Sequence, residues 1–396
     1  MAQYINGLLN LNAWQLVAVA IGFIQFTMMA VTLYLHRDQA HRAINLHPAL
    51  RQVFRFWLWF ATGMHTNEWV AVHRKHHAMC EREGDPHSPQ VFGLRKVLLE
   101  GAELYKAETQ NRDTIDKYAR GTPDDWIQRH LYWRYPNLGI TLFVLMCIML
   151  FGAPGIIVLG VQLISIPVFA AGVINGLGHH TGYRNFETAD AATNLVPWGL
   201  WIGGEELHNN HHAFPTSAKF SVRPWEFDIG WMYIVLFRAV GLCEVRRLAP
   251  KPGMRTNPRI DLQTLQAVLV NRMHVLRDYT RTVTLAEFHE ERRRLAASGN
   301  ALLQRARKLL VRRPERLDPE ALSRLDELLA KNARLRQVHE FREQLVGIWE
   351  QANVSNEHLL EQLKAWCAEA EASGIRSLEE FSARLRAYML QPAAAT

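Results

Sequence analysis

Three clusters of histidine carry the clearest chemical signal in this sequence. The chain contains 18 histidines, and the clusters read H-R-D-Q-A-H at residues 36–41, H-R-K-H-H at 73–77 and H-N-N-H-H at 208–212. On a helix, positions i, i+3 and i+4 share one face, so each H-x-x-H-H triplet would direct its three imidazoles into one volume. With the first pair, this predicts eight imidazoles around one site. A single ion could not use them all, whereas two ions with four or five ligands each could.

A ninth imidazole is offered by His179, four residues after Asn175. On a helix these two side chains would share a face, and the Asn175 amide could hold a metal-bound water. Imidazole suits zinc, copper, iron and nickel, but zinc sites usually hold one ion with four ligands. The number of imidazoles therefore favours a redox-active pair of ions in an all-nitrogen site.

Other polar residues near the clusters have supporting roles in this interpretation. Carboxylates often hold the second ring nitrogen of a ligating histidine, and the candidates are Asp38, Glu68, Asp85, Glu205 and Glu206. Isolated histidines are more often structural than ligating, and we assign to that group His47, His65, His87, His130 and His180. Two copies of H-x-x-H-H are much harder to explain as a structural coincidence.

Long apolar runs must position these clusters. The first run covers residues 11–35 without a charged residue, and is long enough to cross a hydrocarbon core of ~30 Å as a helix. Two further runs cover residues 138–151 and 156–174, and the sequence Gly152-Ala153-Pro154-Gly155 between them predicts a tight turn. We therefore expect about three transmembrane helices, the last two forming a hairpin.

The distribution of basic residues predicts how these spans are oriented. No Lys or Arg precedes Arg37, residues 37–134 are rich in both, and the turn at 152–155 has neither. By the positive-inside rule, the N-terminus lies outside, and the histidine clusters and the C-terminus are cytoplasmic. The short run 53–64 separates two clusters, so we expect it in the membrane interface or against the core, not crossing the membrane. Residues 229–242 form a second interfacial candidate.

Residues 251–396 differ in composition from residues 1–250, and we expect two domains on that ground. Leu, Glu, Arg and Ala dominate the later part, with helical periodicity over residues 317–345 and a helix start at Asp318-Pro319-Glu320. This predicts a soluble helical region of unknown role. The predicted fold class is an all-α integral membrane protein with interfacial helices, a cytoplasmic histidine-rich domain and this helical tail.

Charge and cysteine content argue against other classes of protein. The formal net charge is +7, and many basic residues flank apolar runs, where membrane orientation accounts for them. Because the sequence has neither zinc-finger spacing nor an RNA-binding signature, we expect no nucleic-acid partner. The four cysteines are scattered without a C-x-x-C pair, which argues against a disulfide framework or a cysteine metal site.

The clusters and their surroundings resemble the membrane fatty-acyl desaturases, close to the delta-9 type. The resemblance covers about residues 25–245, and its further marks are Glu68-Trp69, Gly84-Asp85-Pro86-His87, Asn175-x3-His179, Gly182-Tyr183-Arg184, Glu205-Glu206-Leu207 and Ala213-Phe214-Pro215. It implies a di-iron centre in which Asn175 binds one iron through water. The implied ligands are His36, His41, His73, His76, His77, His179, His208, His211 and His212.

The resemblance also implies the reaction. O2 and two electrons would remove hydrogen from two adjacent methylenes and leave a cis double bond, at the delta-9 position, in an acyl chain carried on CoA or on a membrane lipid. A saturated C–H bond offers no handle for acid–base chemistry, so the metal supplies the oxidising power and the protein supplies a narrow, bent, apolar tunnel. The candidate substrate-binding residues are Trp69 in the tunnel wall, and Arg74, Arg95 and Lys96 for phosphates.

Departures from the family bear on substrate and electron donor. Ala71-Val72 stand where animal acyl-CoA desaturases carry Arg-Asp, which weakens a CoA-specific interpretation. Animal members also have two spans before the first cluster, whereas one is found here. The tail carries no cytochrome b5 signature, so electrons would come from a separate donor of the ferredoxin or reductase type. Together with the predicted topology, this favours a bacterial inner membrane.

Two alternatives remain open on the sequence alone. A membrane di-iron hydroxylase or alkane monooxygenase would use the same metal logic, although the context from Asn175 to Tyr183 favours desaturation. A metal-handling membrane protein should show ionisable residues along a path through its spans. The spans here are nearly free of such residues, and the histidines lie at one boundary.

Overall fold

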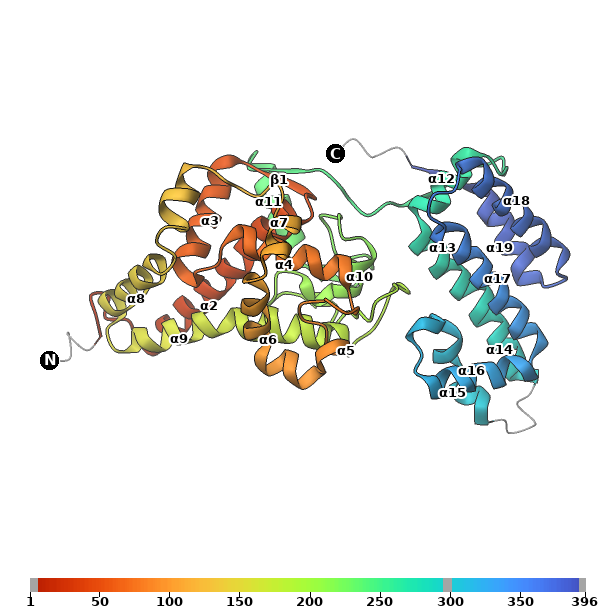
Figure 1. The fold of residues 1–396 in the computed structure, drawn as a ribbon, viewed down its shortest axis with the longest axis horizontal. Helices are drawn as coiled ribbons and strands as arrows, with labels where there is room; N and C mark the ends of the chain where they lie inside the picture. Colours follow the sequence, from red (N-terminus) through yellow and green to blue (C-terminus); the bar gives the residue numbers. More distant parts are fainter. Residues whose placement is uncertain (1–5, 295–300, 392–396) are drawn as a thin grey trace. The chain divides into compact units, whose positions relative to one another are not determined.

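The computed structural model describes residues 6–294 and 301–391, which form two compact units (Figure 1). The N-terminal unit consists of Met1–Arg184 and Asp190–Ala249. The C-terminal unit consists of Pro250–Thr396 together with a short earlier segment, Asn185–Ala189. The inclusion of this segment in the later unit has no signal in the sequence.

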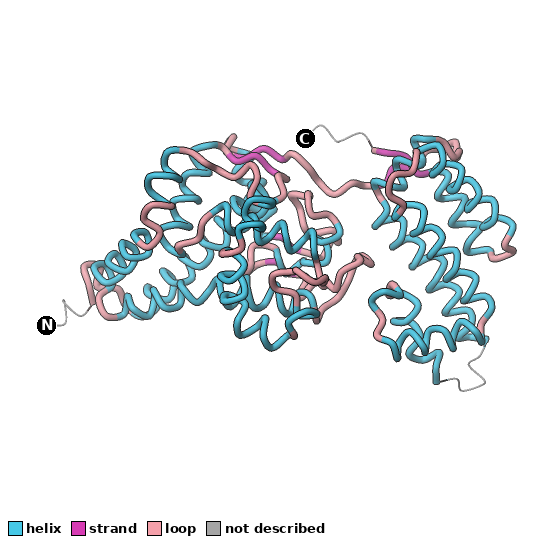
Figure 2. The backbone as a smooth tube through the Cα atoms, viewed as in Figure 1, coloured by secondary structure: helices cyan, strands magenta, loops and turns pink. Residues whose placement is uncertain are grey.

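Helices dominate the N-terminal unit, as Figure 2 shows, which confirms a mainly helical class. They are α2 (Ala13–Ala30), η1 (Val31–Ala40), α3 (Pro48–Thr62), α4 (Thr66–Met79), α5 (Pro89–Phe92), α6 (Leu94–Thr109), α7 (Arg112–Tyr118), η2 (Gln128–Tyr132), α8 (Leu138–Phe151), α9 (Pro154–Ile166), η3 (Pro167–Ile174), η4 (Leu177–His179), η5 (Glu205–Leu207), α10 (His208–Ala213) and α11 (Ile229–Ala239). Two short strand pairs join distant segments: β1 (Ile44–Leu46) runs antiparallel to β4 (Cys243–Val245), and β2 (Trp198–Gly199) runs parallel to β3 (Phe227–Asp228).

Two helical stretches in the described chain are long and apolar enough to cross a membrane. The helix α2 continues through η1 as one stretch of 28 residues, Ala13–Ala40, and α9 continues through η3 and η4 as Pro154–His179, with 26 residues. The third predicted span forms α8, which has only 14 residues and falls short of the ~20 residues that a hydrocarbon core requires. Two spans are therefore found by length and composition, and the third stays a prediction.

The predicted turn between α8 and α9 is confirmed. Helix α8 ends at Phe151, Gly152 follows with a φ of 65°, and Pro154 occupies the first turn of α9. A positive φ suits glycine, and proline suits a helix start. A Cβ on Gly155 would lie 2.2 Å from the Cys147 carbonyl oxygen, so only glycine permits the two helices to approach this closely.

Helix α3 contains the short apolar run between the first two histidine clusters. It packs against α2 and α8, and the Trp57 indole donates a hydrogen bond of 2.8 Å to the Thr27 hydroxyl of α2. The Nε2 atoms of His41, before α3, and His73, after it, are only 2.8 Å apart. The two ends of the segment that contains α3 therefore lie close together. This confirms that the apolar run does not separate the first two clusters.

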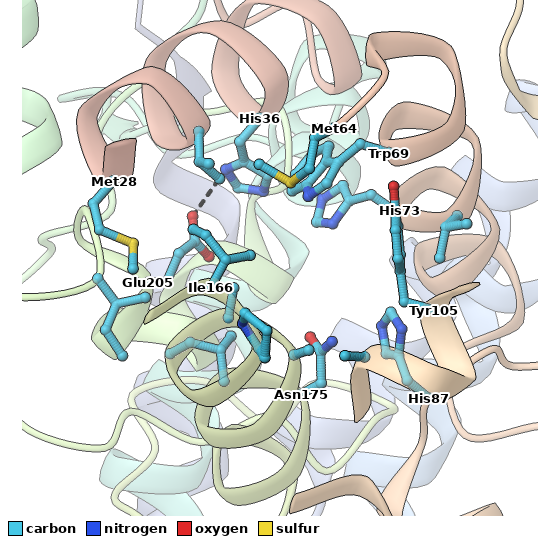
Figure 3. Close-up of a pocket in the computed structure, with 18 of the residues that line it drawn as sticks. Met28, His36, Met64, Trp69, His73, His87, Tyr105, Ile166, Asn175 and Glu205 are labelled. Atoms are coloured by element: carbon cyan, nitrogen blue, oxygen red, sulfur yellow. Dashed lines mark ion pairs between the residues drawn. The ribbon is translucent and has the colours of Figure 1, made fainter. Parts of the chain in front are cut away.

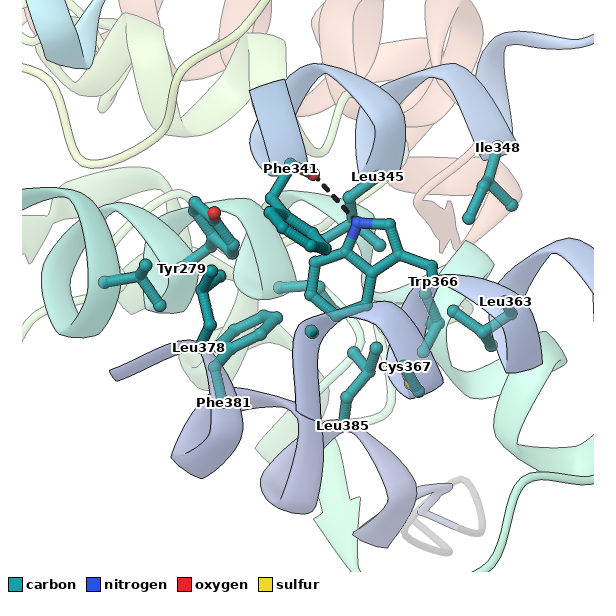
Figure 4. Close-up of a cluster of buried hydrophobic side chains, with 14 of the residues drawn as sticks. Tyr279, Phe341, Leu345, Ile348, Leu363, Trp366, Cys367, Leu378, Phe381 and Leu385 are labelled. Carbon is teal, nitrogen blue, oxygen red and sulfur yellow. Dashed lines mark hydrogen bonds between the residues drawn. The ribbon is translucent and has the colours of Figure 1, made fainter. Parts of the chain in front are cut away.

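The C-terminal unit is a bundle of helices. These are α12 (Leu262–Val270), α13 (Arg272–Tyr279), η6 (Thr280–Thr284), α14 (Leu285–Arg294), α15 (Ala301–Val311), η8 (Pro314–Arg316), α16 (Pro319–Lys331), α17 (Ala333–Glu350), α18 (Asn356–Ala372) and α19 (Arg376–Ala387). Its strands β5 (Pro252–Met254) and β6 (Tyr388–Leu390) pair in antiparallel fashion. In its core, the Trp366 indole lies among aromatic and aliphatic side chains and donates to the Phe341 carbonyl over 2.9 Å (Figure 4).

The predicted helix start in this unit is confirmed. The Asp318 side chain accepts a hydrogen bond of 2.7 Å from the Ala321 N–H, and Pro319 follows at the first helical position. The periodic stretch 317–345 is not one helix, however. It breaks at Asn332, whose side chain donates to the Leu328 carbonyl, because asparagine competes for backbone groups at a helix end.

Candidate metal centre

The structure brings the nine predicted histidines together in two groups. The five-histidine group contains His36, His41, His73, His77 and His211. The four-histidine group contains His76, His179, His208 and His212. Within each group, one nitrogen of every ring lies within 4.8 Å of those of the others. The expectation of two ions with four or five ligands each is matched by this geometry.

The spacing of the ring nitrogens suits metal coordination. Metal–imidazole bonds of ~2.1 Å at right angles would place neighbouring ligand nitrogens ~3.0 Å apart. The Nε2–Nε2 distances are 2.8 Å for His41 with His73, 3.0 Å for His77 with His211, 3.2 Å for His76 with His179 and 3.0 Å for His179 with His208. The chemistry of the donor set therefore fits two metal ions.

A change of helix type explains the spacing of the first pair. His36 and His41 are five residues apart, which would place them on different faces of an α-helix. They lie at η1, where the helix is wound with π geometry, and the His41 N–H donates to the His36 carbonyl over 3.0 Å. A π-helix pairs residues i and i+5 and is often found at functional sites. Both imidazoles therefore reach the same group.

Each H-x-x-H-H motif contributes to both groups. On α4, His73 and His77 are one helical turn apart and enter the five-histidine group, while His76 enters the other. On α10, His208 and His212 enter the four-histidine group, and His211 enters the five-histidine group. The sequence pattern predicted that each triplet directs its imidazoles into one volume. In the structure each of the two helices lies between the two groups: α4 gives two histidines to the five-histidine group and one to the other, and α10 gives one and two.

Carboxylates hydrogen-bond to the second ring nitrogen of three of these histidines and lie close to that of two more. A ligating imidazole that binds metal through Nε2 carries its proton on Nδ1 and donates it to such a partner. The Nδ1–carboxylate distances are 3.0 Å from His76 to Asp85, 3.2 Å from His179 to Glu81, 2.9 Å from His212 to Asp190, and 2.9 and 3.6 Å from His36 and His208 to Glu205.

Sequence reasoning found only some of these carboxylates. Asp85 and Glu205 were among the candidates, and each contacts an imidazole. Asp38 instead forms an ion pair of 2.7 Å with Arg51, and Glu206 accepts the N–H groups of Trp201 and Ile202. Among the described ion pairs, Glu68 has no imidazole partner. Glu81 and Asp190 were missed, and for Asp190 no signal existed, because it lies 22 residues from His212.

Burial favours the neutral form of three imidazoles of the five-histidine group. It lowers the pKa of His73, His77 and His211 well below the ordinary value, and the neighbouring imidazoles lower each pKa further. A neutral imidazole has the free lone pair that metal binding needs. Glu205 shows the opposite balance: although burial alone raises its pKa, the His36 and His208 imidazoles hold the pKa of Glu205 below the ordinary range.

An apolar cavity of about 240 Å³ ends at both groups (Figure 3). Met28 and Val31 of the first long helix, Ala102 and Tyr105 of α6, and Ile166 of α9 line its walls. Its histidine end is formed by His36 and His73 from one group and by His76 and His208 from the other. The cavity therefore leads an apolar ligand to the boundary between the two groups.

Comparison with known proteins agrees with this arrangement. Residues 12–228 match the family model described as fatty acid desaturase, which is more than half of the chain. The chain belongs to the fatty acid desaturase family. Residues 264–394, about a third of the chain, match a separate model described as transposase.

Relatives of this desaturase include plant and cyanobacterial proteins. It is 30% identical to Delta-9 desaturase-like 5 protein of Arabidopsis thaliana, over 57% of this chain and 75% of the relative. It is 28% identical to Delta-9 acyl-lipid desaturase 2 of the same plant, over 58% and 74%. It is 29% identical to sn-1 stearoyl-lipid 9-desaturase of Synechocystis sp., over 60% and 74%. The family is therefore of the delta-9 type, and the protein is an oxidoreductase acting on fatty acyl chains.

The substrate-binding candidates of this desaturase lie in different places. Trp69 lines the cavity, and its ring stacks on His73 at a centroid distance of 4.8 Å. Asn175 also lines the cavity and lies across it from Trp69 in Figure 3. Arg95 and Lys96 are exposed at the start of α6, whose later residues line the cavity.

The contacts of Arg74, the third candidate for substrate phosphate, are with the backbone of this chain. Its guanidinium donates four hydrogen bonds of 2.8–3.0 Å to backbone carbonyls, those of Gln39, Ala40, Tyr118 and Arg120. A guanidinium has five N–H donors, and these contacts occupy most of them. Arg74 therefore braces the chain around the first histidine cluster instead of facing a ligand.

Glu205 offers a sharp test of the two-centre arrangement, because it contacts His36 of one group and His208 of the other. In Glu205→Gln, one oxygen becomes an NH2 that cannot accept from an imidazole N–H. We expect metal affinity to fall about 10–100-fold, measured as metal retained against a competing chelator. The control is Glu206→Gln, which keeps the oxygen that accepts from two backbone N–H groups. Equal retention in both variants would contradict the role of Glu205.

Proposed function

We propose that this desaturase is an O2-dependent di-iron enzyme that introduces a cis double bond at the delta-9 position of a saturated acyl chain. The observation that carries the proposal is the position of two imidazole groups at the end of one apolar cavity. The proposed ligands are His36, His41, His73, His77 and His211 for one iron, and His76, His179, His208 and His212 for the other, with Asn175 holding a water at the second. Two groups of imidazoles, with five and four members, that meet at the end of one cavity are the basis for assigning both ions to one redox pair.

The chemistry requires a strong oxidant, because the C–H bonds of a saturated chain cannot be activated by acid–base catalysis. When bound, the iron pair supplies that oxidising power with O2 and two electrons. One hydrogen is removed from each of two adjacent methylenes and a C=C bond forms, while O2 takes up these two hydrogens, the two electrons and two protons from solvent and is reduced to two waters. In this proposal the protein residues orient the imidazoles, exclude water and present two particular carbons of the chain.

The cavity walls do this positioning. Met28, Ile166 and Ala171 are apolar, so an acyl chain that enters displaces water without leaving a polar group unpaired. Trp69 stacks on His73 and so sets both the ring orientation of a proposed ligand and the width of the cavity beside it. Carbons that lie between the two groups of imidazoles are the ones exposed to oxidation.

Filling the cavity should abolish turnover without removing metal. Ala102 lies in the cavity wall on α6, and Ala107 is exposed on the same helix. We expect Ala102→Phe to lower product formation by more than about 10-fold, since a phenyl ring occupies space that the chain needs, and Ala107→Phe to leave it unchanged. Product is measured in cells, and iron in the purified proteins. Loss of iron in Ala102→Phe, or unaltered product, would contradict this use of the cavity.

We further propose that the acyl chain is carried on a membrane lipid. Several relatives are named for acyl-lipid or stearoyl-lipid substrates. Ala71 and Val72 are fully buried here, so that part of α4 has no exposed basic group for CoA. Arg95 and Lys96 are exposed at the start of α6, the helix whose later residues line the cavity, and are the proposed contacts for a phosphate head group. Conversion of stearoyl-CoA but not of stearoyl phospholipid by purified protein would reverse this assignment.

The electron donor and the membrane orientation complete the proposal. A separate donor of the ferredoxin or reductase type supplies the two electrons. The protein lies in a bacterial inner membrane with three spans, the N-terminus outside and the histidine groups cytoplasmic.

Ala153, exposed in the turn before α9, would then face the outside. We expect Ala153→Cys to react with a membrane-impermeant maleimide in intact cells, and Ala107→Cys to react only after lysis. The reverse pattern would overturn the orientation.

The function is tested by expressing the protein in a bacterial host and analysing cellular fatty acids by gas chromatography and mass spectrometry. The control is a His76→Ala and His211→Ala double variant, which removes one proposed ligand from each group. New cis-monoenes that vanish in the control establish desaturation and locate the double bond. Hydroxylated products would instead identify a hydroxylase, because a hydroxyl and a double bond differ in mass. Purified protein that binds no iron would refute the di-iron centre.

A further inference from the structure

An exposed apolar surface lies on the strand pair β2–β3 of the N-terminal unit. We call it the tryptophan surface, and its members are each 38–61% exposed: Val196, Trp198, Leu200, Trp201, Trp225 and Phe227. The pairing of Trp198 with Phe227 joins its two segments. Large apolar side chains that gather on an exposed face mark a place where another molecule or a membrane binds.

The first segment of this surface is attached to both of the long apolar helical stretches. Leu195 and Ile202, on either side of the exposed side chains, pack in one cluster with residues of Ala13–Ala40 and of Pro154–His179. The members of that cluster are Ile24 and Met28 from the first stretch, and Ile166, Phe169, Val173 and Ile174 from the second. Both ends of the exposed segment therefore lie at a level where these helices are apolar.

Two further contacts place the surface beside the end of the first apolar run. The Thr32 hydroxyl donates to the Gly203 carbonyl over 2.8 Å. Arg37 forms its ion pair of 2.9 Å with Asp228, the residue that follows Phe227. Arg37 is also the first residue of the chain that carries a Lys, Arg, Asp or Glu side chain. In a membrane, the level at which an apolar helix gives way to charge is the boundary between acyl chains and head groups.

Backbone groups of the tryptophan surface find their partners within the protein. The Phe227 N–H donates to the Pro197 carbonyl over 2.9 Å, and the Trp201 N–H donates to the Glu206 carboxylate over 2.7 Å. Acyl chains offer no hydrogen-bond partner, so a segment that contacts them must satisfy its backbone internally. These contacts permit the segment to lie against lipid.

The residue types of the surface match a lipid boundary. Tryptophan is enriched where membranes meet water, because its ring is apolar and its N–H is polar. Basic side chains accompany the rings: the Arg223 guanidinium lies 5.7 Å from the centroid of Trp225, and the Lys219 ammonium lies 5.9 Å from that of Trp231. Long basic side chains of this kind cover apolar surface with their stems and present their charge to phosphate head groups.

Helix α11 extends the surface, because it follows β3 directly. Val235 and Leu236 follow Met232 by three and four residues, so these three exposed side chains share one face of the helix. Ile234 is buried in the core on the other side. Three exposed arginines lie at the end of the helix or just beyond it: Arg238, Arg246 and Arg247. An apolar face flanked by basic residues is typical of a helix in the membrane interface, where anionic head groups attract the basic residues.

We propose that the tryptophan surface and the exposed face of α11 bind the lipid bilayer at the boundary between acyl chains and head groups. The bilayer then reaches the wall of the apolar cavity, because Ile202, which follows Trp201, lines that cavity. The proposal rests on the two apolar helical stretches and on these contacts, and it does not depend on iron. Failure of the desaturation test would therefore leave it unchanged.

The test uses the full-length protein in liposomes of phosphatidylethanolamine and phosphatidylglycerol, with a nitroxide label on one added cysteine. Leu200→Cys and Val235→Cys place the label on the two parts of the proposed surface. The matched control is Leu322→Cys on α16, since Leu322 is 38% exposed and Leu200 is 41% exposed. Leu322 stands in the sequence between Glu320 and Arg324, which form an ion pair. The signal of labelled protein without an added cysteine is subtracted.

Relaxation of the label distinguishes lipid from water, because dissolved oxygen concentrates in lipid and a charged nickel chelate stays in water. We expect the ratio of the oxygen effect to the nickel effect to be several-fold higher at residues 200 and 235 than at residue 322. Equal ratios at the three positions would show that water covers the surface. Protection of residues 200 and 235 from both reagents would show that protein covers it. Either result overturns the proposal.

Fluorescence quenching tests the tryptophans themselves without an added cysteine. In liposomes whose lipids carry bromine on the acyl chains, tryptophans that contact lipid are quenched. A variant that combines Trp198→Phe, Trp201→Phe and Trp225→Phe keeps three aromatic rings, and should lose a large part of the quenchable fluorescence. The control is Trp366→Phe, from the buried core of the C-terminal unit, which should leave the quenchable part unchanged. Retention of all quenchable fluorescence in the triple variant would contradict lipid contact.

Discussion

His77→Ala is expected to empty one metal site while His76→Ala, its neighbour in the chain, empties the other. His77 lies in the five-histidine group, where its Nε2 is 3.0 Å from that of His211. His76 lies in the four-histidine group, 3.2 Å from His179. Each variant should lose about one iron per chain. Product formation should fall in both by more than about 100-fold, the upper end of the loss for residues that only support a ligand.

The measurement is iron content together with fatty acid analysis of cells that express each variant. Combining His77→Ala with His211→Ala, from the same group, should cost no further iron. Combining His77→Ala with His212→Ala, from the other group, should leave none. His130→Ala is the control, because this histidine is exposed and its ring bonds only the Trp126 carbonyl among the described contacts of its nitrogens. If the two double variants retained the same amount of iron, His76 and His77 would share one site, and the division into two groups would be contradicted.

The second large effect concerns Arg37, which lies beside the first metal ligand. Its side chain and that of Asp228 are both 0% exposed, and they form an ion pair of 2.9 Å. The guanidinium also lies 3.9 Å from the centroid of Phe220. Asp228 accepts the N–H groups of Phe220 and Trp231, so it joins the start of α11 to the first histidine helix.

Arg37→Ala should lower the free energy of unfolding by about 3–5 kcal/mol, because it leaves a buried carboxylate without its partner. Unfolding is measured in detergent on metal-free protein, so that lost metal does not contribute. The control is Arg129→Ala, from an ion pair with Asp124 in which both side chains are more than half exposed. There water can replace the guanidinium, and the expected loss is small. Equal losses in the two variants would show that burial of the pair does not govern its contribution.

Much of the candidate site follows from local spacing. Histidines at i, i+3 and i+4 must share one side of a helix whatever surrounds it, so the two triplets on α4 and α10 were predictable. The charge-free run 11–35, the glycine–proline turn at 152–155 and the cap at Asp318 are equally local, since each depends on the backbone preferences of a few residues. A small set of adjacent residues determines all of these features.

Other features needed contacts between distant parts of the chain. The division of the nine histidines into five and four depends on where α4 and α10 lie between their neighbours. Two triplets with identical spacing send opposite members to each group, so spacing alone could not predict it. The π winding at η1 brings His36 and His41 to the same group although they are five residues apart. No spacing of residues in the sequence predicts where an α-helix changes to π winding.

The supporting charges illustrate the same limit. Asp85 lies nine residues from His76 and was a natural candidate, but Asp190 meets His212 from 22 residues away and Glu81 meets His179 across 98. Arg74, a cation with the right place in the chain for a phosphate, is taken up by four carbonyls. Local preferences of the backbone and the apolar pattern thus determined the helices and the identity of the ligands. Tertiary packing decided which ion each ligand serves and which charges orient it, because these depend on approach in space and not on order in the chain.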